Sequence, residues 1–394
     1  MIRGTVMTEL LYNKDAYIKE FDSIVISCEE MTYDKKKAYA IILESTCFFP
    51  EQGGQDSDLG ELIADEASKV LHVSIKDNVI THVCSKELKA GIKVHGKIDW
   101  EHRFDLMQQH SGEHLVSGTV HKLFGYDNVG FHLSTREVTL DFNGTFEDSE
   151  IQNIENIVNK AIYENFETHI FFPSKDELSR LEYRSKKEIL GDVRIVEYPG
   201  YDICACCAPH VHRTGEIGMI KIAAYEHFKG GTRVWIRCGS RALSYFDQVL
   251  DSAKAISRIN SVKIEDISGA VEKLVSTVKD LRYNNIKLER DLLEIYSKAA
   301  LTDKVPAVFV ESCDADSARE TVNSMAAASD NYCFVFIGND EKGYRFLLGS
   351  DKKDCRQMLA SMKEVFTIKG GGSESLIQGN ISASQTEIKE FLAK

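Results

Sequence analysis

The chain has 394 residues, of which 43% are hydrophobic and 9% aromatic, enough for the cores of two or three domains. Its net charge of −13 argues against a protein that coats nucleic acid, because binding to phosphates depends on Lys and Arg. Two basic stretches, at 180–194 and 229–241, leave transient contact with RNA open. No segment reaches the roughly 18 apolar residues of a membrane span. Ten cysteines without a secretory leader indicate a reduced, cytoplasmic chain with no membrane partner.

The first 95 residues predict strands, because short runs rich in Val, Ile and Thr alternate with Asp, Lys and Gly. These runs lie at 22–30, 37–46, 70–77 and 78–87. They predict a small antiparallel barrel or sandwich. From Asp99 to about Phe124 the apolar spacing becomes helical. Further strands are expected at 137–142, 193–198 and 218–227, with a helix at 148–165.

The second half of the chain predicts a long helix and then a compact α/β domain. Residues three and four apart form a heptad pattern, with the polar Asn285 at a position that fixes register: Val271, Leu274, Val278, Leu281, Asn285, Leu288, Leu292 and Ile295. This pattern fits a hairpin with the preceding helix (Tyr245, Val249, Ile256) or the seam of a homodimer, and the two can coexist. Strands at 307–312, 332–339 and 344–350 then alternate with helices at 318–328 and 354–365.

The expected fold class is therefore multidomain α+β. We divide the chain into a β-barrel (1–95), an α/β core (96–242), a helical arm (243–302) and a C-terminal α/β domain (303–394). The last domain carries a glycine-rich loop of Gly370, Gly371 and Gly372, and closes with a short helix.

Two pairs of residues predict one metal site. His110 and His114 are four apart on a helix, so both imidazoles project from one face. Cys206 and His210 offer a second half-site, C-x3-H, and mixed thiolate and imidazole ligands favour one Zn²⁺ per chain. Cys204 and Cys207 are alternative thiolates, and His212 is a spare ligand that we rank below His210.

Glu113 lies between the two helical histidines, and "HSGEH" matches the H-x-x-E-H signature of a zinc protease family. In that family the glutamate is a general base and a distant glutamate is the third ligand. No residue here marks such a ligand, and a C-x3-H partner is foreign to the pattern. A protease is therefore disfavoured, while Glu113 remains a candidate catalytic residue that holds a water molecule.

Three segments, "STCFFPEQGGQDSDLGEL", "HSGEHL" and "CCAPHVHRTGEIG", occur in this order. Together they resemble the editing domain of alanyl-tRNA synthetase and its free-standing relatives, the AlaX alanyl-tRNA editing proteins. There the motifs run T-x-F-Y-x-x-x-G-G-Q, H-x-x-x-H and C-x-x-x-H-V-x-x-T-G-x-I-G. The tail "KGGGSESLIQGN" is similar to the DHHA1-like C-terminal domain of alanyl-tRNA synthetase, so the resemblance is to the long form of AlaX.

The resemblance implies a zinc-containing editing core that hydrolyses the ester of mischarged tRNA(Ala), chiefly Ser-tRNA(Ala) and also Gly-tRNA(Ala). Thr46 and Gln55 then read the serine, and the Gln52–Gln55 turn approaches the substrate. A site built to bind a hydroxyl rejects a substrate without one by roughly 10⁴-fold. Four protein ligands close a tetrahedral shell, so whether zinc activates water or only orients the substrate stays open. Two departures from the family are Cys207-Ala208-Pro209 for Gly-Gly-Thr, and Phe49 for Tyr.

For contact with tRNA the candidates are basic residues of the second basic stretch and of the tail: Lys229, Arg233, Arg237, Arg241 and Lys369, together with Gly370, Gly371 and Gly372. Two other classes of function remain. One is a non-catalytic, zinc-containing tRNA-binding protein, and the other is a metal-dependent hydrolase of small esters or peptides. No adenylate-forming synthetase domain is expected before the barrel.

Overall fold

The computed structural model describes residues 7–185 and 193–394. The chain divides into two compact units, Met1–Ser252 and Ala253–Lys394, and both mix helices with sheets, so the α+β multidomain prediction is confirmed. Residues 186–192 of the basic stretch expected at 180–194 lie outside the described residues. Within the described parts, no helix has the length and apolar character that a membrane crossing requires. All ten cysteines are free thiols.

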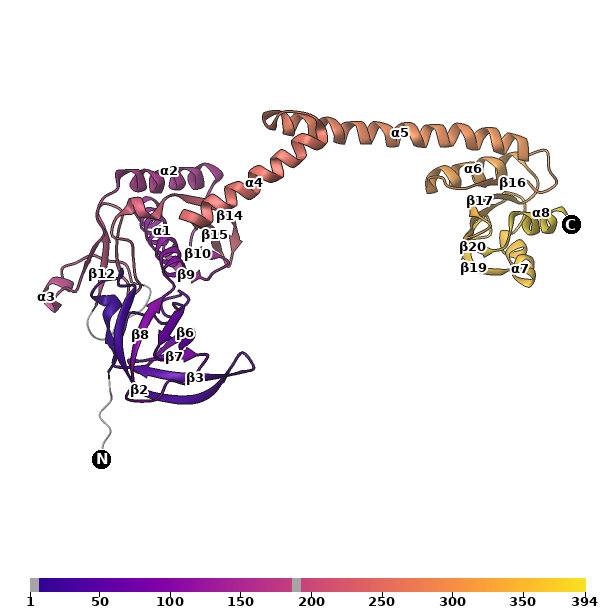
Figure 1. Ribbon diagram of the computed structural model, residues 1–394. Helices are drawn as coiled ribbons and strands as arrows, with labels where there is room; N and C mark the ends of the chain where they lie inside the picture. The colour runs from indigo at the N-terminus through magenta and orange to yellow at the C-terminus, as the bar shows by residue number, and fades with distance from the viewer. Residues whose placement is uncertain (1–6, 186–192) are drawn as a thin grey trace. The chain divides into compact units, whose positions relative to one another are not determined.

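The N-terminal strands of the first unit close into an antiparallel barrel in the order β2-β3-β7-β6-β5-β8 (Figure 1). Side chains alternate along each strand, so Val25, Ile41 and Leu62 fill the interior. The barrel strands are β2 (Glu20–Tyr33), β3 (Lys36–Leu43), β5 (Gly60–Ile63), β6 (Ala67–Lys76), β7 (Val79–Cys84) and β8 (Lys93–Ile98). Beside them, β1 (Glu9–Leu10) pairs with β4 (Ser45–Thr46), and a 3-10 turn follows at η1 (Leu11–Asn13).

The rest of this unit is built around one helix, α1 (Trp100–Phe124). The Asp99 carboxylate caps its first turn by accepting from His102 N, and Gly125 ends it in the left-handed conformation. A sheet in the order β14-β15-β10-β9 and a second helix, α2 (Asp148–Glu164), pack with it. The sheet strands are β9 (Asn128–Leu133), β10 (Val138–Phe142), β14 (Ile220–Phe228) and β15 (Gly231–Cys238).

A second, three-stranded sheet completes the unit in the order β11-β12-β13. Its strands are β11 (His169–Phe171), β12 (Ile195–Tyr198) and β13 (Asp202–Ala205). Two short helical segments flank it, α3 (Lys175–Leu178) and η2 (Thr214–Ile217).

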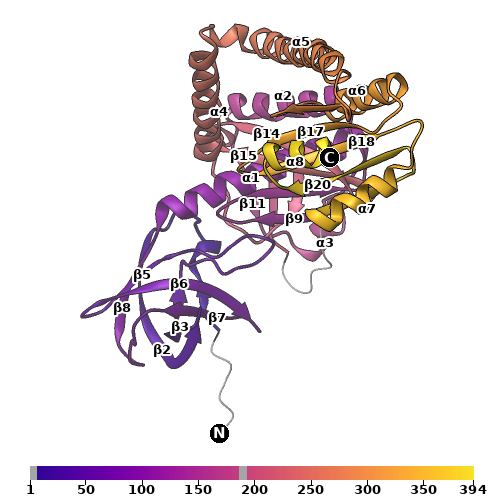
Figure 2. The same cartoon turned by 90° about the vertical axis from the view of Figure 1, so that its right-hand side faces the viewer.

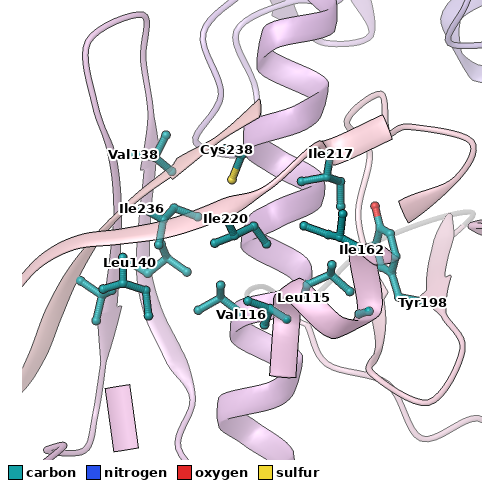
Figure 3. Packing of buried hydrophobic residues seen from close by; sticks show 14 of the residues in the cluster. Leu115, Val116, Val138, Leu140, Ile162, Tyr198, Ile217, Ile220, Ile236 and Cys238 are labelled. Carbon is teal, nitrogen blue, oxygen red and sulfur yellow. The ribbon is translucent and has the colours of Figure 1, made fainter. Parts of the chain in front are cut away.

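Helix α1 is buried on all sides between Leu106 and Val120. Leu115 and Val116 pack with Ile220 and Ile236 of the four-stranded sheet, as Figure 3 shows. Polar residues are nevertheless frequent in this stretch, and a buried polar group is costly unless it is paired. The buried polar side chains of this helix therefore need partners, either elsewhere in the fold or in a ligand.

The barrel is fixed to α1 through a fully buried ion pair. Arg103 donates from Nε to Asp58 Oδ1 at 2.8 Å and from Nη2 to Asp58 Oδ2. The same guanidinium donates to the carbonyl oxygens of Ala16 at 2.9 Å and Cys47 at 2.5 Å. Asp58 Oδ2 also accepts from Phe49 N at 2.5 Å. These bonds satisfy both charges and hold segment 47–58 against the helix.

The second unit is a three-layer α/β domain, in which helices cover both faces of one sheet (Figures 1 and 2). The sheet order is β16-β17-β18-β20-β19. Its strands are β16 (Ala307–Val310), β17 (Cys333–Asn339), β18 (Gly343–Gly349), β19 (Thr367–Gly372) and β20 (Leu376–Ser382). The end of α5 (Ile267–Ala300) and α6 (Ala315–Ala328) pack on one face, and α7 (Cys355–Val365) and α8 (Gln385–Ala393) pack on the other.

One local expectation in this domain is wrong. Gly370, Gly371 and Gly372 do not form a loop, because they lie in the edge strand β19 and pair with Gly379, Gln378 and Ile377 of β20. A Cβ at Gly370 would lie 2.6 Å from the carbonyl oxygen of Gln378, so close strand pairing explains that glycine.

The helical stretch consists of α4 (Gly239–Asn260), a short turn η3 (Ile264–Asp266) and α5. The expected heptad helix lies within α5, and its apolar residues are exposed along most of its length. Leu281 and Leu288 keep 63% and 66% of their surface exposed.

Removing one charge of the buried pair should destabilise the first unit strongly. In the Asp58→Asn variant the Arg103 guanidinium stays buried without its counter-charge, which costs about 3–5 kcal/mol of unfolding free energy. Urea denaturation followed by circular dichroism measures this loss. The matched control is Glu30→Gln, which breaks the exposed Lys37–Glu30 pair of the same barrel and should leave the midpoint unchanged. Equal effects of the two substitutions would contradict the proposed role of the buried pair.

Candidate metal centre

Four predicted ligands from α1 and the segment after β13 meet in one cluster. The donor atoms of His110, His114, Cys206 and His210 all lie within 4.8 Å of one another. Cys206 Sγ is 3.5 Å from His110 Nε2. Two such ligands on one tetrahedral zinc ion would be about 3.6 Å apart, given bonds of about 2.3 Å to sulfur and 2.05 Å to nitrogen. The spacing therefore fits a shared metal ion.

His110 is oriented by Gln55. The His110 Nδ1–H donates to Gln55 Oε1 at 2.7 Å, so the other nitrogen, Nε2, faces Cys206. Gln55 ends a two-residue hairpin whose central residues, Gly53 and Gly54, have φ of 67° and 86°, as a tight turn of this type requires. A Cβ at Gly54 would lie 2.7 Å from the carbonyl oxygen of Phe131. Glycine therefore lets the turn dock on β9, which brings Gln55 to the helix.

His114 is oriented by a carboxylate on β13. Its Nδ1–H donates to Asp202 Oδ2 at 2.8 Å. Arg184 donates two further hydrogen bonds to the same carboxylate, from Nε at 2.7 Å and from Nη2 at 2.8 Å. Burial alone would lower the pKa of His114, but Asp202, with Cys206 and Glu113 nearby, raises it to about 9. A cation that binds Nε2 must therefore displace a proton, so the affinity for the cation decreases as the pH is lowered.

Among the three neighbouring cysteines, the electrostatics favour Cys206 as the thiolate. Burial opposes its ionisation, yet His110 and His114 hold the pKa of the Cys206 thiol well below its ordinary value. Burial instead raises the pKa of Cys204, which stays a thiol. Cys207 packs with Tyr12 and Phe49 and is not among the four donors that lie within 4.8 Å of one another. Arg194 fixes the ligand loop by donating to the carbonyl oxygens of Cys206 and Ala208, at 2.8 and 2.9 Å.

His210 gives the sharpest sign that the cluster holds a ligand. The residue is fully buried, and neither ring nitrogen has a hydrogen-bond partner among the described residues. Burial lowers its pKa to about 3, so the ring is a neutral imidazole with a free lone pair. An unpaired buried imidazole is costly unless a ligand satisfies it. Three imidazoles and one thiolate are a donor set typical of zinc, so these residues fit the metal.

A second cluster of donor groups, His114, Asp202 and Cys204, is less suited to a cation. Its histidine nitrogen and its carboxylate already bond to each other, and the Arg184 guanidinium neutralises that carboxylate. The thiol of Cys204 is also held in its protonated form.

Glu113 lies at the edge of the first cluster. Its Oε1 accepts from Ser117 Oγ at 2.7 Å and from Asn128 Nδ2 at 2.8 Å. Its Oε2 lies 3.9 Å from His114 Nε2, the nitrogen that faces the ligand cluster. A buried carboxylate is thus fixed by one oxygen, with the other beside the metal ligands.

The remaining predicted substrate residues lie at different depths. Gln52 is exposed at the start of the turn, whereas Thr46 is fully buried in the barrel. His82 Nδ1–H donates to the Ile41 carbonyl, so its Nε2 accepts from the Thr46 hydroxyl at 2.9 Å. Burial lowers the pKa of His82 to about 4, consistent with this neutral form. The Thr46 hydroxyl therefore donates its hydrogen bond to His82 inside the barrel.

The candidate tRNA residues are divided between the two units and differ in their local partners. Arg233 and Arg241 are paired with Asp141 and Asp105, so much of their charge is neutralised. Arg237 lies over the ring of Tyr245, and Lys229 lies over that of Phe228. Neither of these two has an acidic partner within ion-pair distance in the described structure. Lys369 is exposed on β19, in the second unit.

Comparison with known proteins agrees with the motifs. The family model for tRNA synthetases class II (A) matches residues 7–102, and that for the threonyl and alanyl tRNA synthetase second additional domain matches residues 193–234. The chain is 27% identical to the alanyl-tRNA editing protein Aarsd1 of Danio rerio, over 96% of each chain. It is 29% identical to the Mus musculus protein of that name, over 94% of this chain and 93% of the relative. Identity to alanyl-tRNA editing protein AlaX-L of Pyrococcus horikoshii is 26%, over 97% of this chain and 96% of the relative.

The chain is similar to alanyl-tRNA editing proteins along nearly its whole length. The resemblance drawn from the three motifs is thereby confirmed, including the long form, because AlaX-L is matched along nearly its whole length. The first family match covers the barrel and the Gln52–Gln55 turn, and the second covers Cys206 and His210.

Several residues that surround the candidate site escaped the sequence analysis. Asp202 lies only four residues before Cys206, and an acidic residue so close to a ligand motif was a usable signal. Arg184 and Arg194 belong to a stretch read as a basic surface, but both side chains turn inward. Nothing in the sequence indicated the role of Arg194, because its hydrogen-bond partners are backbone carbonyls, which every residue has. Asn128 lies 15 residues from Glu113, and only the fold brings them together.

The ligand assignment predicts a cobalt spectrum that depends on one cysteine. Protein loaded with Co²⁺ should show sulfur-to-cobalt charge-transfer absorption with one metal ion per chain. The Cys206→Ser variant should lose this band, because the serine oxygen replaces the thiolate. Cys204→Ser and Cys207→Ser are the matched controls and should keep it. A band that survives Cys206→Ser but disappears in one of these controls would show that the thiolate is misassigned.

Proposed function

We propose that the protein is a trans-editing hydrolase, which cleaves the ester of tRNA(Ala) mischarged with serine, chiefly, or with glycine. We also propose one zinc ion per chain as its cofactor, held by His110, His114, Cys206 and His210. The ten free cysteines fit a site of action in the cytoplasm, where thiols stay reduced. The substrate class follows from relatives named alanyl-tRNA editing proteins that match this chain along almost its full length.

The observation that carries the proposal is the convergence of three distant motifs. The turn at Gln55, the helix at His110 and His114, and the loop from Cys206 to His210 are far apart in sequence but share one buried cluster. Cys206 is the most exposed of the four ligands, while all three histidines are buried. A substrate therefore approaches the cluster from the side of Cys206.

Zinc, when bound, supplies a positive charge that stabilises developing negative charge or orients the substrate. Glu113 is the group placed to accept a proton from the attacking water. The water oxygen bonds to the ester carbonyl carbon, the bond to the ribose oxygen breaks, and that oxygen takes a proton. Free amino acid and tRNA are the products. The bonds from Ser117 and Asn128 keep the carboxylate of Glu113 in place for this step.

Gln55 is the best-placed residue to read serine. Its Oε1 accepts from His110, and its amide nitrogen is buried without a partner in the described structure, so its N–H groups can donate to the serine hydroxyl. Gln52, on the same turn, is exposed and can contact the incoming acceptor end of the tRNA. Thr46 lies deeper, and we assign it to the wall that supports this turn. An alanine ester would leave the Gln55 amide unpaired, which disfavours its reaction.

Contact with the tRNA body is assigned to Lys229, Arg237, Arg233 and Arg241 in the first unit. Lys369 and the strand Gly370–Gly372 are assigned the same role in the second unit. The exposed backbone of β19 and the cation beside it suit a phosphate.

Single-turnover deacylation tests this function. Zinc-loaded protein should release serine from Ser-tRNA(Ala) roughly 10⁴-fold faster than alanine from Ala-tRNA(Ala). Glu113→Gln should slow serine release by about 10²–10⁴-fold, because the general base is lost, and Cys206→Ala should abolish it.

Lys122→Gln is the control, because Lys122 is exposed at the end of α1 and outside the proposed site. If zinc-loaded protein binds Ser-tRNA(Ala) without releasing serine, it is a binding protein rather than an editing enzyme. Equal hydrolysis of free seryl esters would instead indicate a small-ester hydrolase.

We further propose that α5 forms the seam of a homodimer. The residues that the heptad pattern places on one face, among them Leu274, Leu281, Leu288 and Ile295, are more than half exposed. A continuous apolar stripe of this kind is stable in water when a second helix covers it.

Sedimentation of the purified protein tests the seam. The wild-type protein should sediment as a dimer, and the double variant Leu281→Asp/Leu288→Asp should sediment as a monomer, because two charges cannot be buried in the seam. Tyr283 is equally exposed but lies on the opposite side of the heptad, so Tyr283→Asp should remain dimeric. A monomeric wild-type protein would refute the proposal.

A further inference from the structure

We infer that Asp202, held by Arg184, is the positioning residue that fixes the ring of His114 for the metal. This inference rests on the metal part of the proposed function. Both residues lie outside the family motifs in which the ligands were found. Neither belongs to the four ligands, and both act through His114.

The bond between Asp202 and His114 sets one tautomer of the histidine. A carboxylate can only accept, so the proton of His114 must be on Nδ1, where the contact to Asp202 Oδ2 is 2.8 Å long. In the neutral ring, which is the form that binds a metal, the lone pair is then on Nε2, which faces the ligand cluster. A carboxylate in this place both orients the ring and increases the basicity of the metal-binding nitrogen.

Arg184 keeps the carboxylate in that place. Its two donors bind the two Asp202 oxygens at 2.7 and 2.8 Å, so the carboxylate cannot rotate away from His114. Arg184 is itself fixed to β13, because its backbone N donates to Ile203 O at 2.8 Å and its carbonyl accepts from Ala205 N at 2.9 Å. The guanidinium also neutralises Asp202, which makes this carboxylate a supporting group rather than a fifth ligand.

A glycine of α1 is independent evidence that the close contact between Asp202 and the helix is a required feature of the fold. Gly118 lies one turn after His114, in the interior of a helix, where glycine costs about 1 kcal/mol relative to alanine. A Cβ at this position would lie 2.5 Å from both Asp202 Cβ and Tyr201 O. Only glycine lets β13 come close enough to the helix for the carboxylate to reach His114.

Competition with a chromophoric zinc chelator tests the inference. The full-length Asp202→Ala protein should bind zinc 10–100-fold more weakly than the wild type, as expected when a carboxylate partner of a ligand histidine is removed. Asp202→Asn retains an oxygen that can accept from Nδ1–H, so it should recover part of this loss. Arg184→Met keeps Asp202 but removes the two hydrogen bonds that hold its carboxylate, so it should also weaken zinc binding. In both Asp202→Ala and Arg184→Met the Co²⁺ ligand-field spectrum should shift, because the His114 ring is no longer fixed.

Glu155→Gln is the matched control. Glu155 is a buried carboxylate of the same unit that accepts from Lys221 and from Ile222 N, but it contacts no proposed ligand. Its zinc affinity and cobalt spectrum should equal those of the wild type. Zinc binding by Asp202→Ala and Arg184→Met within twofold of the wild type would overturn the inference and leave the metal site intact. A wild-type protein that binds no zinc would instead refute the proposed metal centre itself.

Discussion

A fully buried ion pair between Arg103 and Asp58 is the constraint on which the site depends. Arg103 lies about two turns before His110 on α1, and Asp58 lies three residues after Gln55. The pair therefore fixes the end of the barrel segment that bears Gln55 to the start of the helix that bears the histidines. A charge without access to water has no favourable alternative partner, so the junction is specific as well as stable.

The same principle, a buried polar group with a fixed partner, applies to the candidate metal centre. His110 bonds to Gln55, His114 bonds to Asp202, and Glu113 bonds to Ser117 and Asn128. In each case one nitrogen or oxygen of the side chain makes the hydrogen bond, and the other one faces the cluster. His210 is the exception, since the described residues leave both of its nitrogens unpaired. The thiolate of Cys206 supplies a negative charge, which suits a cation at this cluster.

Sequence was most informative where one residue's chemistry depends on near neighbours. The spacing of His110 and His114, and of Cys206 and His210, was enough to predict both half-sites, and the structure brings all four together. The long helix from Asp99 was equally clear, because its cap and its end are local features. The strands β5 and β8 were missed because they are short, and each contains a glycine that weakens the strand pattern.

Contacts between residues that are distant in sequence were harder to predict. Asp202 and Arg184 reach His114 only because β13 packs against α1, and the charges of Arg184 and Arg194 suggested a surface rather than a buried position. The hydrogen bond between the buried Thr46 and His82 could not be predicted either, because no local sequence pattern shows which hydroxyl will find a partner inside a barrel. In each case the deciding contact crosses from one element to another.

The central claim is that three imidazoles and a single thiolate hold the metal. X-ray absorption at the zinc edge of the loaded wild-type protein tests it most directly, because nitrogen and sulfur ligands differ in bond length by about 0.25 Å. The account predicts three nitrogen ligands at about 2.0–2.1 Å and one sulfur at about 2.3 Å. Two sulfur ligands would place Cys204 or Cys207 in the coordination shell, and none would remove Cys206 from it. Either result would contradict the assignment.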